Sequence, residues 1–139
     1  MASILKVDTL TGVTTAGSIS VTGEGNSTTT NLQQGLAKAS INFTQVSTQT
    51  IRSSVNISSL TDAGTGQTSG ISFISSMANS LFAGSFYTNA TTGEARNNFS
   101  NDYAGGFGDK STSSFGTYSY STVNADGAMN DVIIFGDLA

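Results

Sequence analysis

Apolar and polar side chains alternate in several short stretches after residue 38, which is the pattern of half-buried β-strands. The apolar pairs with a two-residue spacing are Ile41 and Phe43, Val55 and Ile57, and Ile71 and Phe73. The segment Thr61–Gly66 is rich in Asp and Gly, and it predicts a turn between the last two of these strands. Short strands separated by such turns favour antiparallel β-structure.

The rest of this region continues the pattern. Further strands are expected around Phe82, Phe86 and Tyr87, around Phe115, Tyr118 and Tyr120, and at Val132, Ile133, Ile134 and Phe135. Residues 75–81 predict a short helix or a loop, with Met77 and Leu81 pointing inward. Residues 90–114 contain few aliphatic side chains and many Gly, Asn and Ser, so we interpret them as long loops at the distal end.

Regular short strands with Gly-containing turns predict an antiparallel β-sandwich or jelly-roll over residues 39–139. Its expected core is Ile41, Phe43, Val55, Ile57, Leu60, Ile71, Phe73, Phe82, Phe86, Val123, Ile133 and Phe135.

Residues 1–38 form a separate N-terminal module in this interpretation. Residues 1–30 look extended, with Gly at intervals and period-two alternation at Ile19 and Val21. The large apolar side chains here are too few to form a core of their own. This segment is therefore expected to dock on copies of itself or on another protein.

Residues 31–38 are the best helical candidate, because Asn31 suits an N-cap and Leu32 and Leu36 lie four residues apart. Gly35 weakens a helix that is already barely two turns long. One interpretation places Leu32 and Leu36 of three copies on a common axis. The alternative is a single helical turn packed on the following domain.

Composition supports an all-β chain with a polar surface. Charged residues make up only 10 % of the 139 residues, whereas 42 are Ser or Thr, 16 are Gly and none is Pro. Thr packs well on a pleated sheet, while Ser, Thr, Asn and Gly are weak helix formers. A small chain without Cys has no disulfides, so we expect it to gain stability by oligomerisation.

Charge argues against nucleic acid as a partner, and the lack of a long apolar stretch argues against membrane insertion. The formal net charge is -4, and the five basic residues are scattered, whereas a nucleic-acid site needs clustered Lys and Arg. No stretch approaches the roughly 18 apolar residues of a membrane-spanning helix. We therefore expect neither nucleic-acid binding nor membrane insertion.

The residue types also exclude much catalytic chemistry. Without His or Cys, the chain has no Ser-His-Asp or Cys-His site and none of the common zinc sites. Seven of the nine carboxylates lie beside a Gly or an Asn, which is typical of turns. We predict no enzymatic activity, no cofactor and no metal centre. A Ca²⁺ ion held in the long loop by Asp102 and Asp109 with Asn98 and Asn101 is a minor alternative, since their spacing fits no EF-hand pattern.

Aromatic side chains in or near the long loops are candidate receptor contacts, because aromatic rings stack on sugars at binding surfaces. These residues are Tyr103, Phe107, Tyr118 and Tyr120. The alternative is that some of them belong to the core or to a subunit interface.

Two N-terminal stretches, Ile4–Ile19 and Gly23–Lys38, resemble the start of short fibre and structural proteins from marine phages, especially cyanophages. Looser similarity continues at Val55–Gly66, at Ile71–Leu81 and in the closing residues 136–139. The chain departs from that pattern at residues 39–40 and 67–70, where a Trp, Val or Tyr is expected.

The resemblance implies a bacteriophage virion protein, a short homotrimeric fibre or spike subunit on the tail or the capsid. Its expected partners are other virion proteins, its own copies and a host-surface glycan. The alternatives are a capsid decoration protein without a receptor role, and a host-glycan adhesin. The expected virion anchor is Ile4, Leu5, Val7, Leu10 and Val13. The expected trimer interface is Ile19, Val21, Leu32 and Leu36.

Overall fold

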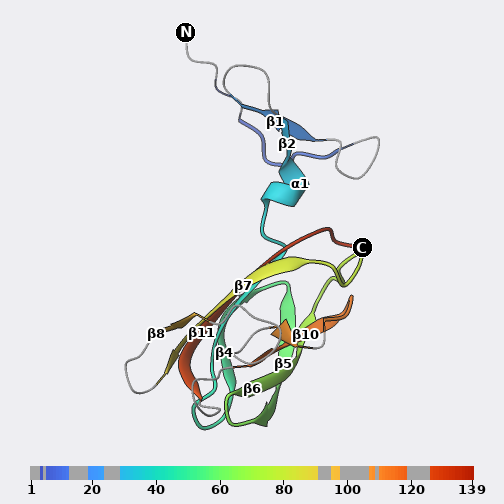
Figure 1. The fold of residues 1–139 in the computed structure, drawn as a ribbon. Coiled ribbons are helices and arrows are strands. Elements are labelled where there is room, and N and C mark those ends of the chain that lie inside the picture. Colours follow the sequence, from blue (N-terminus) through green and yellow to red (C-terminus); the bar gives the residue numbers. More distant parts are fainter. Residues whose placement is uncertain are drawn as a thin grey trace. The chain divides into compact units, whose positions relative to one another are not determined.

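The structure is a computed structural model that describes residues 4, 6–12, 19–23, 29–90, 95–97, 107–108, 110–118 and 126–139, with the backbone alone at 33–34, 90, 95–97 and 107. In this part of the chain, regular structure is β-strand apart from one helix of four residues (Figure 1). The chain divides into two compact units, Met1–Leu36 and Ala37–Ala139. The boundary lies two residues before the one expected at residue 38.

The first unit contains a small hairpin. Strand β1 (Ser20–Thr22) pairs antiparallel with β2 (Thr29–Asn31), and Val21 lies opposite Thr30. Helix α1 (Leu32–Gly35) follows at once, and the Leu32 amide donates to the Ile19 carbonyl over 2.8 Å. The predicted helix over 31–38 is therefore shorter than expected, because Asn31 belongs to the hairpin and two turns containing a Gly are marginal.

The second unit contains two antiparallel sheets. The five-stranded sheet has the order β4 (Thr50–Val55), β3 (Ala39–Thr44), β11 (Gly127–Phe135), β7 (Ala83–Ala90) and β8 (Ala95–Asn97). The four-stranded sheet has the order β5 (Ile57–Gly64), β6 (Gln67–Phe73), β10 (Ser114–Tyr118) and β9 (Phe107–Gly108). The predicted all-β, antiparallel class is confirmed, while the jelly-roll topology and the trimer stay predictions.

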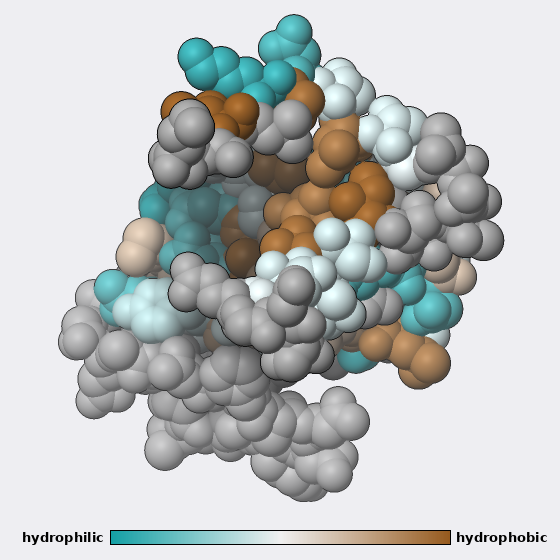
Figure 2. All heavy atoms as spheres, turned by 90° about the horizontal axis from the view of Figure 1, so that it is seen from above, coloured by the Kyte–Doolittle hydropathy of each residue, from teal (hydrophilic) through white to brown (hydrophobic). Residues whose placement is uncertain are grey.

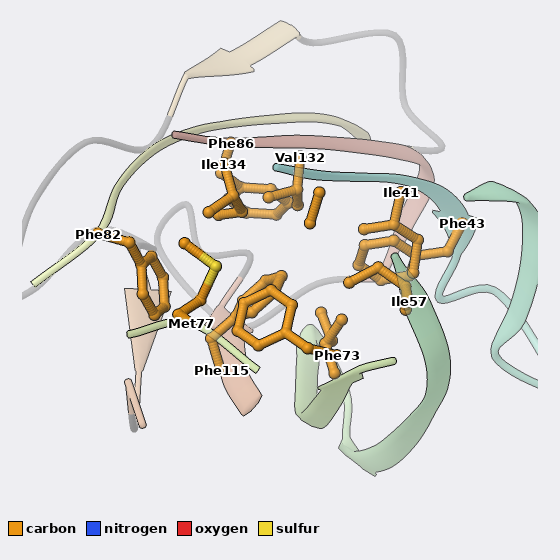
Figure 3. Close-up of a cluster of buried hydrophobic side chains, with 12 residues drawn as sticks. Ile41, Phe43, Ile57, Phe73, Met77, Phe82, Phe86, Phe115, Val132 and Ile134 are labelled. Atoms are coloured by element: carbon orange, nitrogen blue, oxygen red, sulfur yellow. The ribbon is translucent and has the colours of Figure 1, made fainter. Parts of the chain in front are cut away.

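One hydrophobic core lies between the two sheets (Figure 3). The five-stranded sheet contributes Ala39, Ile41, Phe43, Phe86, Val132 and Ile134, and Phe82, the residue before β7, joins them. The four-stranded sheet contributes Ile57, Ile71, Phe73 and Phe115, and the connection between β6 and β7 contributes Met77. Seven of the predicted core residues are thus confirmed, namely Ile41, Phe43, Ile57, Ile71, Phe73, Phe82 and Phe86. Leu60 is half-buried against this cluster, and Val123 lies outside the described residues.

Three phenylalanine rings join the sheets at one end of the core. Phe73 lies 5.6 Å from Phe82 in an edge-to-face arrangement and 5.4 Å from Phe115, measured between ring centroids. The Lys110 ammonium lies 5.2 Å from the Phe82 ring centroid and also donates to the Phe82 carbonyl. Aromatic and cation–π contacts each add of the order of 0.5–1 kcal/mol to simple burial.

The chain crosses from one sheet to the other at Asn56, which separates β4 from β5. Asn56 has a φ of 56°, and its side chain is braced by Ser75: the amide nitrogen donates to the Ser75 carbonyl, and the Ser75 amide donates to Oδ1. Asn tolerates this left-handed conformation better than most residues. The prediction that Val55 and Ile57 share one buried strand face is therefore wrong, because Val55 ends exposed on one sheet and Ile57 begins buried on the other.

The facing of the last strand also differs from expectation. Val132 and Ile134 are buried, while Ile133 and Phe135 are each 37 % exposed. Four consecutive apolar residues carry no period, so the sequence alone did not decide which pair faces inward. Leu81, also expected inward, is 86 % exposed, whereas Met77 is buried as expected.

Residues 90–114, interpreted as long loops, supply an edge strand to each sheet. Strand β8 pairs with β7, and β9 pairs with β10. Both strands are only two or three residues long. Their apolar alternation is too short to be recognised in sequence.

The facing of β11 gives a direct test. Replacing fully buried Ile134 with Ala should lower the free energy of unfolding by about 2–5 kcal/mol through cavity formation. The same change at neighbouring Ile133 should cost about 1 kcal/mol or less, because its side chain is partly in solvent. Urea denaturation of both variants measures the difference; equal losses would contradict this facing.

Candidate functional site

The predicted anchor residues in the described part of the chain are exposed. Ile4 is 77 % exposed, and Val7 and Leu10 are each 55 % exposed. No strand includes them. Leu5 and Val13, the other predicted anchor residues, lie outside the described residues. Three large apolar side chains of this short segment are therefore exposed to solvent.

The predicted trimer-interface residues lie in or next to the hairpin and helix of the same unit. Val21 and Leu36 are about half exposed, at 52 % and 53 %. Ile19 and Leu32 are half-buried, and the backbone hydrogen bond described above joins them. All four lie within one small unit whose own burial leaves apolar area available.

A second apolar surface lies on the outer face of the five-stranded sheet. We call Val55, Ile133 and Phe135 the outer patch. Ser40 pairs with Val55 on one side and with Ile133 on the other, so these three residues form one row on the same face. Phe135 lies two residues further along β11, on that face too. In the space-filling view, apolar side chains reach the surface among polar ones (Figure 2).

The three residues of the outer patch were predicted to lie in the core, and this prediction is wrong because all three are exposed. Val55 is 61 % exposed, and Ile133 and Phe135 are each more than a third exposed. Further along the same face the surface becomes polar, where the Asn42 side-chain amide donates to Asp131 Oδ1 over 2.6 Å. Contiguous exposed apolar side chains with a polar border are typical of protein-interaction surfaces.

Of the candidate receptor contacts, only Tyr118 can be located by its side chain. It lies in β10 and is 38 % exposed. A Cβ at Gly108, on neighbouring β9, would collide with the Tyr118 ring. Phe107 is described by its backbone in β9, and Tyr103 and Tyr120 lie outside the described residues.

The interior also contains a polar half, which the sequence did not indicate. It consists of the buried residues Gln45, Thr68, Thr88, Thr117 and Asn130. Thr68 pairs with Thr117 in one sheet, and Thr88 pairs with Asn130 in the other. The pattern could have been noticed only by tracing inward positions along each strand once the register was known.

Gln45 connects the two sheets in this polar half. Its side-chain amide donates to Thr68 Oγ1 over 3.1 Å, and its Oε1 accepts from the Gly127 amide over 2.9 Å. Thr68 Oγ1 in turn donates to Gln49 Oε1 over 2.7 Å. Such buried networks fix one arrangement of the sheets, because each lost partner leaves a polar group unpaired.

The described ranges contain neither a metal-binding cluster of acidic, His or Cys side chains nor a membrane-spanning helix. There, no group of three or more acidic, His or Cys side chains is placed to hold a metal ion. In the same part of the chain, no helix has the length and apolarity needed to cross a bilayer. The loop containing Asp102 and Asp109 lies outside those ranges.

Comparison with known proteins finds no matching family model, no matching curated protein and no matching solved structure. The resemblance to phage structural proteins consequently stays a prediction from the residues.

Gly127 gives a test of the polar half. A Cβ there would collide with Thr88 Oγ1 and Asn130 Oδ1, both buried. Gly127→Ala should therefore destabilise the protein by about 1–3 kcal/mol through overpacking. Gly35→Ala is the matched control, since a Cβ at Gly35 meets no atom within 4 Å. Thermal melts compare the two, and an unchanged melt for Gly127→Ala would show that this region repacks freely.

Proposed function

We propose that this chain is a structural subunit of a bacteriophage virion. It is a short trimeric fibre or spike protein that attaches to the tail or capsid through residues 1–38 and projects the two-sheet domain outward. The observation that carries this proposal is the exposure of Ile4, Val7 and Leu10 in a unit whose described residues form a small hairpin and one helical turn. The resemblance of the same segment to marine-phage proteins supports it.

Energetics favour a preformed partner for this segment. Burying one large apolar side chain contributes roughly 1.5–3 kcal/mol. Ordering each residue of an extended segment costs about 1–2 kcal/mol. Ile4, Val7 and Leu10 therefore offset the ordering of their own segment only where a groove or a strand edge is already present.

The exposed apolar residues after the predicted anchor support self-association into a trimer. Val21 and Leu36 are about half exposed. Closed three-fold symmetry would cover these side chains in every copy. Host-surface contact is part of this proposal too, and exposed Tyr118 is the described residue that supports it.

The outer patch favours a second function, a capsid decoration protein without a receptor role. Val55, Ile133 and Phe135 place apolar surface on the side of the two-sheet domain. A protein bound through this face would lie side-on against the capsid. Attachment would then depend on the outer patch and not on residues 1–38.

The trimer is tested by light scattering. The chain has a mass of 14.2 kDa, so three copies give 3 × 14.2 = 42.6 kDa. We expect this mass at micromolar concentration, and a decrease when Leu32 and Leu36 are both changed to Ser. A folded, stable monomer of the unaltered chain would contradict the trimer.

The two modes of attachment are separated by incorporation into particles. Deleting residues 2–12 should leave the two-sheet domain folded and remove the protein from purified particles. The matched variant Ile133→Ser with Phe135→Ser should be incorporated normally. The reverse result, with the deletion incorporated and the double variant lost, would contradict N-terminal anchoring and favour side-on decoration.

A further inference from the structure

Two oxygen atoms in the polar half of the interior have no hydrogen-bond partner among the described residues. They are Thr117 Oγ1 and Asn130 Oδ1. Both residues are completely buried, with 0 % exposure. An unpaired buried polar group costs about as much as a lost hydrogen bond, so such atoms in a folded protein need an explanation.

The orientation of the Asn130 amide is fixed by its other contacts. Its Nδ2 donates to the Gly127 carbonyl over 3.0 Å and to the Phe43 carbonyl over 3.3 Å. Exchanging nitrogen and oxygen would place Oδ1 against two carbonyl oxygens and lose both bonds. The unpaired atom is therefore an acceptor oxygen.

The two unpaired oxygens flank the link between the sheets. Asn130 Oδ1 lies beside Gly127, whose amide donates to Gln45 Oε1. Thr117 pairs in the ladder with Thr68, whose hydroxyl accepts from the Gln45 amide. The two unpaired oxygens therefore belong to residues next to the two hydrogen-bond partners of the Gln45 side-chain amide, Gly127 and Thr68.

The chemistry of this region selects its ligand. All five residues of the polar half are neutral amides or hydroxyls. A buried cation without a carboxylate would be strongly disfavoured, because burying an unpaired charge costs far more than burying a dipole. An apolar molecule would leave both oxygens unpaired. Water donates to an amide oxygen and both donates to and accepts from a hydroxyl.

We propose that the polar half of the interior is a water-binding site, in which bound water hydrogen-bonds to Asn130 Oδ1 and Thr117 Oγ1. The water pairs the two oxygens of this region that have no protein partner. The site stands independently of the virion function, since it rests only on the interior of residues 37–139.

The site is tested by NMR on the full, isotopically labelled chain, with water-selective cross-relaxation measured in the rotating frame. We expect direct cross-peaks from long-lived water to the Asn130 side-chain amide and to the Thr117 methyl group. Cross-relaxation with bound water and chemical exchange of protons give rotating-frame cross-peaks of opposite sign, so the sign of each peak distinguishes the two. Absence of both cross-peaks in the folded protein would overturn the proposal.

A variant pair provides a second measurement. Thr117→Val keeps the shape of the side chain and removes the hydroxyl. If Thr117 holds water, this change should lower Tm by about 4–8 °C, because the water loses a partner. Thr61→Val, on the exposed edge strand β5, should leave Tm nearly unchanged. A higher Tm for Thr117→Val would show that the hydroxyl is unpaired and dry. If that variant does not fold, the NMR result on the unaltered chain decides alone.

Discussion

The rest of the structure depends on the pairing of strand β11 with two neighbours at once. It lies at the centre of the five-stranded sheet, between β3 and β7. Because both ladders fix its register, alternate residues must face opposite sides. One set, Asn130, Val132 and Ile134, faces the four-stranded sheet, while Ile133 and Phe135 face outward. A shift of one residue would exchange the core for the outer patch.

This pairing also divides the interior into two chemically different halves. Val132 and Ile134 continue into the apolar core, whereas Asn130 belongs to the polar half with Gln45 and the buried threonines. A chain in which 42 of 139 residues are Ser or Thr has limited apolar volume for its interior. Hydrogen bonds between the two sheets, such as that from Gln45 to Thr68, therefore hold the sheets together alongside the apolar core, provided that their polar groups are paired.

Where the apolar period was clear, the sequence predicted the fold well. Ile41 and Phe43, and Ile71 and Phe73, each alternate with one polar residue, and all four are buried. Prediction failed where the local pattern does not indicate which side chains face the core. The apolar run 132–135 has no period, so its facing depends on ladder partners that lie between 46 residues (Val132 to Phe86) and 95 residues (Ile134 to Ala39) earlier in the chain.

A second failure lies at Asn56. An alternating pattern across residues 55–57 looks like one strand, yet the chain changes sheets there at a left-handed residue braced by Ser75. The bracing contact is 19 residues away, beyond the reach of a local pattern. Among the candidate sites, the exposure of Ile4, Val7 and Leu10 agrees with the expectation that residues 1–30 contain too few apolar side chains to bury them; their role as an anchor stays a prediction. The outer patch and the polar half depend on register, which only the fold supplies.

The central claim is that the N-terminal segment attaches this subunit to a virus particle. It is tested most directly by lysine cross-linking and mass spectrometry of intact particles, because Lys6, Lys38 and Lys110 sample the anchor, the start of the two-sheet domain and its body. Lys6 is exposed next to Val7, and Lys110 is exposed on the domain. The account predicts that Lys6 cross-links to a different virion protein and that Lys110 does not. Cross-links to another virion protein from Lys110, with none from Lys6, would contradict it.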